Sequence, residues 1–145
     1  MTDGKEVKKR RKFVIFAHSG TYDKLYQTTT IAVTAAAMGE EVYVVLFFEA
    51  LRKFVNGRTD ELDMSPEFPN QGRDVYNKMK TLNPNSITEM IDTVKELGTL
   101  KFLACSANVE FMGFKKEEVL AKVDEITGLP SILKLASEAE TKLYI

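Results

Sequence analysis

The sequence predicts an α/β protein: a three-layer α/β/α sandwich with a mainly parallel sheet. Two continuous apolar runs, Phe13–Ala17 and Val42–Phe48, are rich in β-branched and aromatic residues, which is typical of strands buried on both faces. Helix-forming residues dominate the stretch Lys24–Met38 between them. A strand, a helix and a second strand with short connections form a βαβ unit, which makes the two strands parallel.

Length and composition fit a single domain. The 145 residues are 44% hydrophobic, which is enough to bury a core. Residues 1–12 hold six basic and two acidic side chains, so we predict a flexible basic tail before one domain over 13–145. The net charge of −1 argues against a nucleic-acid binder. We expect no transmembrane segment, no secretory signal and a cytoplasmic location, because no apolar stretch is long enough.

The first helix is predicted to begin with Asp23 as its N-cap and to stop at Gly39. Its small-residue face is expected to pack on the sheet, and it consists of Leu25, Thr29, Ala32, Ala36 and Met38. A short helix over Glu49–Val55 is expected after the second strand.

The segment 56–86 holds three of the four prolines and few apolar residues. Since a structureless loop of about 30 residues is unusual in a compact domain, we predict a short helix inside it. Four residues at helical spacing are expected to dock that helix: Val75, Tyr76, Met79 and Leu82. The part around 64–72 is a candidate lid or subunit contact.

The next helix is predicted to begin at Ser86, with Glu89 completing a capping box, and to end at Gly98. Its apolar stripe is Ile87, Met90, Ile91, Val94 and Leu97. A third strand over Lys101–Ala104 is expected to end at Cys105. We then predict helical segments over 106–112 and 116–126, a helix from Gly128 to Ala139 and a last strand over 143–145.

Cysteine and histidine each occur once, as Cys105 and His18. A disulfide within the chain, a cysteine-rich zinc site and a histidine-built metal site are therefore excluded, and we expect no metal and no cofactor. A lone cysteine also favours a reducing compartment.

Cys105 lies at a predicted turn from strand to helix. Ligand and active sites of open α/β sheets form beyond the carboxyl ends of the strands. The helix that follows would direct free N–H groups toward the sulfur, which favours the thiolate. We therefore expect a solvent-reachable Cys105 with a lowered pKa, and the alternative is a small buried hydrophobic residue.

Two titratable residues are candidates for moving protons near this thiol. His18 follows the first strand, and Glu110 comes five residues after Cys105. Each has a structural alternative, as a hydrogen-bonded loop histidine or a solvated helix carboxylate. The turn Ser19–Thr21 could bind a phosphate, but the chain lacks G-x-G-x-x-G and P-loop motifs.

The segment Leu103–Val119 resembles the cysteine motif of the DsrE/DsrF-like sulfur-relay family. The matching residues are Ala104, Cys105, Glu110, Met112, Gly113, Glu117 and Glu118. Three further segments resemble the family's opening unit, second strand and closing helix and strand: Val14–Gly39, Val42–Leu51 and Ile132–Ile145. The stretch between Cys105 and Glu110 departs from relatives that are rich in methionine there, and Glu49 stands where an aromatic residue is frequent.

The resemblance implies a DsrE-like fold that assembles into homo- or hetero-oligomers, of which we expect a homo-oligomer here. It also implies a cysteine that carries sulfur as a persulfide between donor and acceptor proteins. That role falls on Cys105. The leading hypothesis is therefore a sulfur carrier or sulfurtransferase-like protein. Alternatives are a thiol oxidoreductase of peroxiredoxin-like type, a small-ligand or nucleotide-binding regulatory module with a structural Cys105, and a structural subunit of a larger complex.

Overall fold

The structure, a computed structural model, describes residues 9–68 and 72–145. The predicted tail falls largely on residues 1–8, and part of the candidate lid on 69–71, both outside the described residues. A five-stranded sheet has the order β4-β3-β2-β1-β5, and every neighbouring pair is parallel. The strands are β1 (Lys12–Ala17), β2 (Glu41–Leu46), β3 (Leu100–Cys105), β4 (Glu125–Thr127) and β5 (Thr141–Tyr144).

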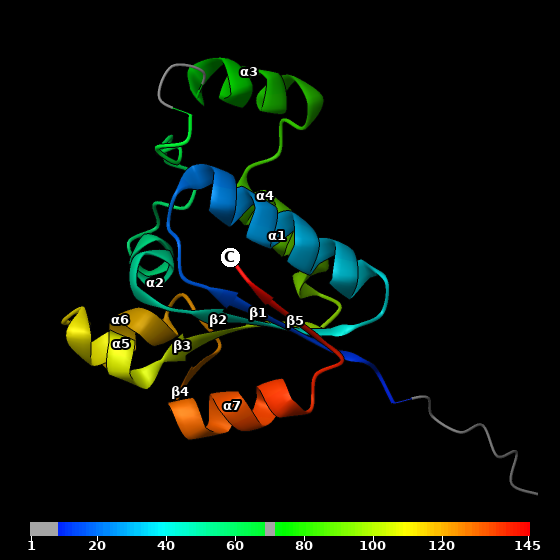
Figure 1. Cartoon of the computed structure of the whole chain (residues 1–145), viewed down its shortest axis with the longest axis vertical. Helices are drawn as coiled ribbons and strands as arrows, with labels where there is room; N and C mark the ends of the chain where they lie inside the picture. The colour runs from blue at the N-terminus through cyan, green and yellow to red at the C-terminus, as the bar shows by residue number, and fades with distance from the viewer. Residues whose placement is uncertain (1–8, 69–71) are drawn as a thin grey trace, which may run out of the picture.

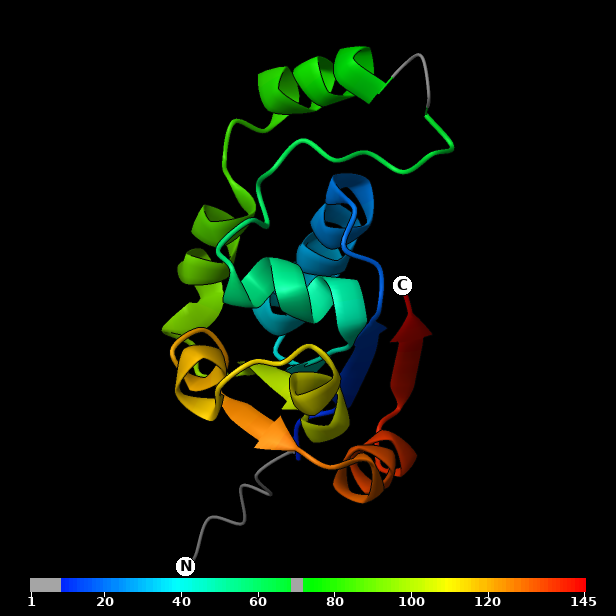
Figure 2. The same ribbon diagram turned by 90° about the vertical axis from the view of Figure 1, so that its left-hand side faces the viewer.

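Helices cover both faces of this sheet, which confirms the predicted α/β/α sandwich (Figure 1). In chain order they are α1 (Tyr22–Ala37), α2 (Phe48–Val55), α3 (Gly72–Leu82), α4 (Ile87–Lys95), α5 (Ser106–Phe111), α6 (Lys116–Leu120) and α7 (Leu129–Ser137). The helices α1 and α4 lie on one face and α7 on the other. The short helices α5 and α6 lie at one end of the sheet, and α3 stands apart at the top (Figures 1 and 2).

Strand alternation divides the core into two apolar clusters. On β1, Ile15 packs in the cluster under α1 and α4, and its neighbour Val14 packs in the cluster under α7. Both side chains have no exposed surface. Because both faces are covered, the strands are apolar at nearly every position, as the continuous runs of the sequence predict.

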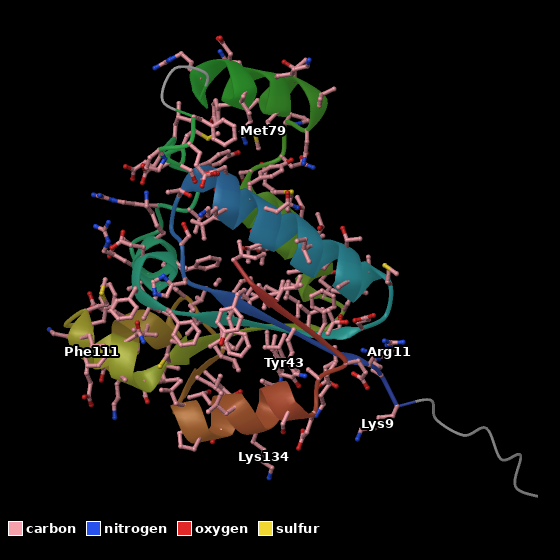
Figure 3. All side chains as sticks on the ribbon, viewed as in Figure 1. Lys9, Arg11, Tyr43, Met79, Phe111 and Lys134 are labelled. Carbon is pink, nitrogen blue, oxygen red and sulfur yellow. The ribbon has the colours of Figure 1, made fainter. Side chains whose placement is uncertain are left out.

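The predicted helix inside 56–86 is confirmed as α3. Tyr76 and Met79 dock this helix against the core, and Val75 is partly buried. The ring of Tyr76 meets that of Tyr22 edge-on at 5.2 Å between centroids, and Met79 lies on the underside of α3 (Figure 3). Leu82, expected to dock as well, is instead 78% exposed, because the helix ends there.

The capping box of α4 is also confirmed. Ser86 accepts a hydrogen bond from the N–H of Glu89, whose carboxylate accepts one from the N–H of Ser86. The positive φ of 65° at Gly98 ends the chain's helical path. Leu97, expected on the apolar stripe, is exposed because it lies beyond the last turn of α4.

The prediction of Asp23 as an N-cap is wrong. Thr21 takes that position with extended backbone angles, and α1 begins at Tyr22. The Asp23 carboxylate instead accepts hydrogen bonds from the N–H and the hydroxyl of Ser65. It therefore fastens the 60–65 loop over the start of α1. At the other end of α1, Met38 is exposed rather than packed, because it follows the last helical residue.

Two element boundaries also differ from the predictions. The helix expected over 116–126 ends at Leu120, and β4 follows after a short turn. The strand has three residues, too few for a recognisable alternation, and it exists because β3 offers a free edge. Likewise the second strand stops at Leu46 rather than Phe48, where the chain turns sharply into α2.

Candidate functional site

The carboxyl ends of three neighbouring strands meet at one edge of the sheet. The strand register aligns Ala17 of β1 with Leu46 of β2, and Leu46 with Ala104 of β3. His18 and Cys105 therefore each lie one residue beyond this aligned row, on strands separated by β2. Sites of open parallel sheets form at this kind of edge.

Cys105 is the last residue of β3, and its side chain is 1% exposed. It packs in the apolar cluster under α7 with Phe16, Leu103 and Ile132. The expectation of a solvent-reachable thiol is therefore wrong for the single chain in this conformation. The reason is the alternation of β3, which turns the residue at 105 to the same covered face as Leu103.

The helix predicted behind the thiol is present. Cys105 is the N-cap residue of α5, which begins at Ser106, and its side chain makes no capping hydrogen bond. The strand-to-helix junction thus has the predicted position, but its sulfur faces apolar side chains rather than water.

The β2–α2 elbow (residues 46–49) contains a strained residue. Phe48 has a φ of 36°, in the left-handed region that a bulky residue rarely adopts. Its N–H donates to the side-chain oxygen of Asn108 at 2.8 Å. Asn108 belongs to α5 and is 4% exposed, so this hydrogen bond is partly shielded from water. Strained positions persist only where their surroundings hold them, and they concentrate at functional sites.

A glycine lets the first loop approach this elbow closely. A Cβ atom at Gly20 would lie 2.7 Å from the carbonyl oxygen of Glu49, closer than real Cβ atoms come to a backbone atom. The elbow is further tied to β1 by the N–H of Phe47, which donates to the carbonyl of Ala17 at 2.9 Å. The loop after β1, the elbow and α5 therefore form one interlocked unit around the end of the sheet.

Three side chains form an aromatic ridge (His18, Phe48 and Phe111) across this unit. The rings of His18 and Phe48 are 5.2 Å apart, and those of Phe48 and Phe111 are 6.2 Å apart and stacked. Phe48 is 40% and Phe111 is 70% exposed. Phe111 lies at the end of the molecule where α5 lies (Figure 3). An exposed aromatic row at a strand-end site is suited to contact with another molecule.

The two predicted proton-handling residues lie near the ridge but are not joined to the thiol. His18 and Glu110 are both exposed, and within the described part of the chain no hydrogen bond links either side chain to Cys105. The N–H of His18 donates to the carbonyl of Ile145 at 2.9 Å, which places the end of β5 beside it.

Metal and membrane features are lacking among residues 9–68 and 72–145. Within these ranges no three histidine, cysteine or acidic side chains come close enough together to hold a metal ion. None of the helices described there has the length and apolarity to cross a membrane.

Sequence reasoning missed the two residues, Phe48 and Asn108, that tie α5 to the β2–α2 elbow beside Cys105. Asn108 stands in the cysteine turn, where an amide side chain ordinarily predicts a hydrogen bond to neighbouring backbone, whereas its partner is sixty residues away. Phe48 gave no sign of its role, because positive φ is expected of glycine or asparagine rather than of phenylalanine.

Comparisons with known proteins show the family and the fold of the chain. The sequence model of the "DsrE/DsrF/DrsH-like family" matches residues 52–144, which include α5 and Cys105. The sulfur carrier protein DsrE2 of Allochromatium vinosum is 28% identical over 94% of this chain and 99% of its own length. Among solved structures, the protein of unknown function MTH1491 from Methanobacterium thermoautotrophicum superposes with a TM-score of 0.58. It is 11% identical, covers 94% of this chain and 100% of its own, and shows the fold alone. The chain therefore belongs to the DsrE/DsrF/DrsH-like family.

Proposed function

We propose that the chain is a sulfur carrier in which Cys105 holds a sulfane sulfur as a persulfide. The observation that carries the proposal is the place of this lone cysteine. It ends a strand at the site-forming edge of the sheet and directly precedes a helix. The likeness to a relative named as a sulfur carrier supports the same role.

The transfer needs no redox partner. A Cys105 thiolate attacks the outer sulfur of a donor persulfide, so that a new S–S bond forms, the donor's S–S bond breaks and the donor leaves as a thiolate. In the second step an acceptor thiolate attacks the outer sulfur of the Cys105 persulfide, and Cys105 leaves as a thiolate. His18 and Glu110, at the exposed rim, are our candidates for exchanging protons with the incoming and leaving thiols.

Burial of the thiol requires a movement before either step. We infer that α5 swings away from the elbow, since this six-residue helix begins directly after Cys105 and its Ala107 packs against the cluster that buries the sulfur. The hydrogen bond from the Phe48 N–H to Asn108 holds the closed form, and the strain at Phe48 lowers the cost of leaving it. Docking of a partner on the aromatic ridge would supply the rest of the free energy that opening requires.

Partners in this proposal are donor and acceptor proteins and further copies of the chain. Apolar side chains around the site are exposed on several elements: Phe48, Phe111, Leu129, Leu133 and Tyr144. The Tyr144 ring stacks on Phe16 at 4.5 Å between centroids and is still 78% exposed. A homo-oligomer would bury part of this surface. We expect the relay to run in the cytoplasm, where thiols stay reduced.

Intact-mass analysis tests the proposal. The protein is incubated with glutathione persulfide and desalted, and its intact mass is measured by mass spectrometry. A Cys105→Ser variant is treated in the same way. We expect the unmodified chain to gain one sulfur atom, about 32 Da, and the variant to gain none. A second incubation with excess thiol should remove the added mass. No gain in the unmodified chain, or an equal gain in both proteins, contradicts the proposal.

A peroxiredoxin-like thiol oxidoreductase is the alternative chemistry. Peroxide would oxidise Cys105 to a sulfenic acid, which then needs a second thiol to resolve it. Since the chain has one cysteine, that thiol would come from another molecule. Loss of hydrogen peroxide that depends on both Cys105 and an added thiol would favour this alternative over sulfur carriage.

A further inference from the structure

A cavity of about 380 Å³ lies on the face of β3 opposite to Cys105. It opens between α4, the end of α2 and the link from α6 to β4, and we call it the α4–α6 cavity. Its volume falls within the range of small-molecule sites, roughly 300–1,000 Å³. The residues that line it are Phe54, Gly57, Thr59, Thr88, Ile91, Asp92, Lys95, Leu100, Phe102, Leu120, Ala121, Lys122, Val123 and Asp124.

The floor of the cavity is apolar. Leu100 and Phe102 point to this face because they alternate along β3 with Leu103 and Cys105, which pack on the other face. The rings of Phe54 and Phe102 lie 4.9 Å apart at an angle of 36°. The floor can therefore receive an aromatic or aliphatic body on rigid strand and helix residues.

Two carboxylates fix the walls to this floor. Asp124 accepts from the N–H of Phe102 at 2.7 Å, and its own N–H donates to the Phe102 carbonyl at 2.9 Å. On the opposite side Asp60 accepts from the N–H of Ile87 at 2.7 Å and from the Thr88 hydroxyl at 3.3 Å. The loop that holds Asp60 and the link from α6 to β4 are therefore both hydrogen-bonded to helices or strands. The cavity is thus formed before a ligand binds.

The rim carries two ammonium groups, those of Lys95 and Lys122. Neither is in an ion pair with any residue of the described ranges. The Lys122 nitrogen reaches across the mouth, to 3.9 Å from where a Cβ of Gly57 would stand. The lining also holds the carboxylates of Asp92 and Asp124, so its formal charge is balanced. Because Asp124 is turned to the backbone of β3, the two lysine ammonium groups are better placed than this carboxylate to contact a ligand at the mouth.

We propose that the α4–α6 cavity binds a small amphipathic anion, with its apolar body on Phe54 and Phe102 and its carboxylate or phosphate between Lys95 and Lys122. The hydroxyls of Thr59 and Thr88 line the same cavity. This site goes beyond sulfur carriage and does not depend on it, because Cys105 lies on the other side of the sheet.

A matched pair of probes tests both the place and the charge preference. The ¹⁵N-labelled full chain is titrated with indole-3-acetate and, separately, with tryptamine, which offers the same ring with a cation. We expect saturable shifts of the amides of Phe102, Thr88 and Val123 with indole-3-acetate, at a dissociation constant on the order of 1 mM. Tryptamine should bind at least about tenfold more weakly.

Variants then separate this site from other surfaces. The double change Lys95→Gln with Lys122→Gln should weaken indole-3-acetate binding about tenfold, whereas Lys134→Gln, on the outside of α7 (Figure 3), should leave it unchanged. Ala121→Trp, which places an indole in the mouth from an exposed position, should abolish it. Cys105→Ser should have no effect, so failure of the sulfur-carrier proposal leaves this one standing.

Three outcomes overturn the proposal. They are the absence of saturable shifts with indole-3-acetate, equal or tighter binding of tryptamine, and shifts that gather around α7 or the aromatic ridge instead of the cavity. Retention of full affinity in the double lysine variant overturns the assigned anion contact.

Discussion

The two faces of the sheet are covered very differently. Among the described residues, 23 buried apolar side chains form the cluster under α1, α2 and α4, but eight form the cluster under α7. The first face is therefore a thick core that holds the fold. The second is thin, is covered by a nine-residue helix with exposed Leu129 and Leu133, and contains the candidate thiol. Cys105 thus lies where local opening disturbs the smaller share of the core.

The comparison predicts that equal truncations cost more on the thick face. Ile15 under α1 and Ile132 on α7 both have no exposed surface. We expect Ile15→Ala to lower the free energy of unfolding by about 4 kcal/mol and Ile132→Ala by about 2 kcal/mol. The second cost is smaller because the short helix α7 can move into the space that the Ile132 side chain leaves. Urea denaturation measures both. Equal costs would mean that the α7 layer is as rigid as the other.

The next largest effect concerns the hydrogen bond that ties α5 to the β2–α2 elbow beside the thiol. Asn108→Ala removes the acceptor of the partly buried Phe48 N–H, and leaving such a donor without a partner costs about 1 kcal/mol in the closed form. We expect iodoacetamide to alkylate native Cys105 about tenfold faster in this variant.

The control for this experiment is Asn77→Ala, on the exposed face of α3, which should alkylate at the unmodified rate. The unfolding free energy of each protein shows whether faster alkylation reflects global rather than local opening. An unchanged rate in Asn108→Ala would refute the role of this hydrogen bond in covering the thiol.

A smaller effect on stability, dependent on pH, is expected from Asp23, which holds the 60–65 loop over the start of α1. Burial opposes ionisation of Asp23, but its hydrogen bonds from Ser65 prevail and hold its pKa below the ordinary value. A lowered folded pKa stabilises the protein above the unfolded pKa of about 3.9, and this stability is lost as pH falls through the folded pKa.

Asp23→Asn should therefore reduce the loss of stability between neutral pH and about pH 3, by less than about 1 kcal/mol because the site is partly solvated. Denaturation midpoints of both proteins across this range measure it. A steeper acid loss in the variant than in the unmodified protein would contradict the assignment.

The smallest effect is expected at the surface of the thin face. Lys12 bonds Glu138 at 3.1 Å and lowers its pKa, a contribution that is present above the unfolded pKa and lost on acidification. Since Glu138 is solvent-exposed, Glu138→Gln should move the melting temperature by less than about 1 °C at neutral pH. A large shift would show that this ion pair, rather than apolar packing, holds α7 in place.

The sequence alone determined the elements that carry strong local signals. Continuous apolar runs predicted β1 and β2, and the capping box at Ser86 predicted the start of α4. Helical spacing around Tyr76 predicted α3. The position of Cys105 at a strand-to-helix junction followed from the same patterns, because strand composition, turn residues and caps act over a few neighbouring residues.

Only the tertiary structure decided what those elements do to one another. The three-residue β4 forms because β3 offers it an edge, and Asp23 leaves its expected capping role because Ser65 comes within reach. The burial of Cys105 depends on which face of β3 the α7 layer covers, and the strain at Phe48 depends on Asn108 sixty residues away. Contacts between distant segments determine these features, so local sequence patterns could not predict them.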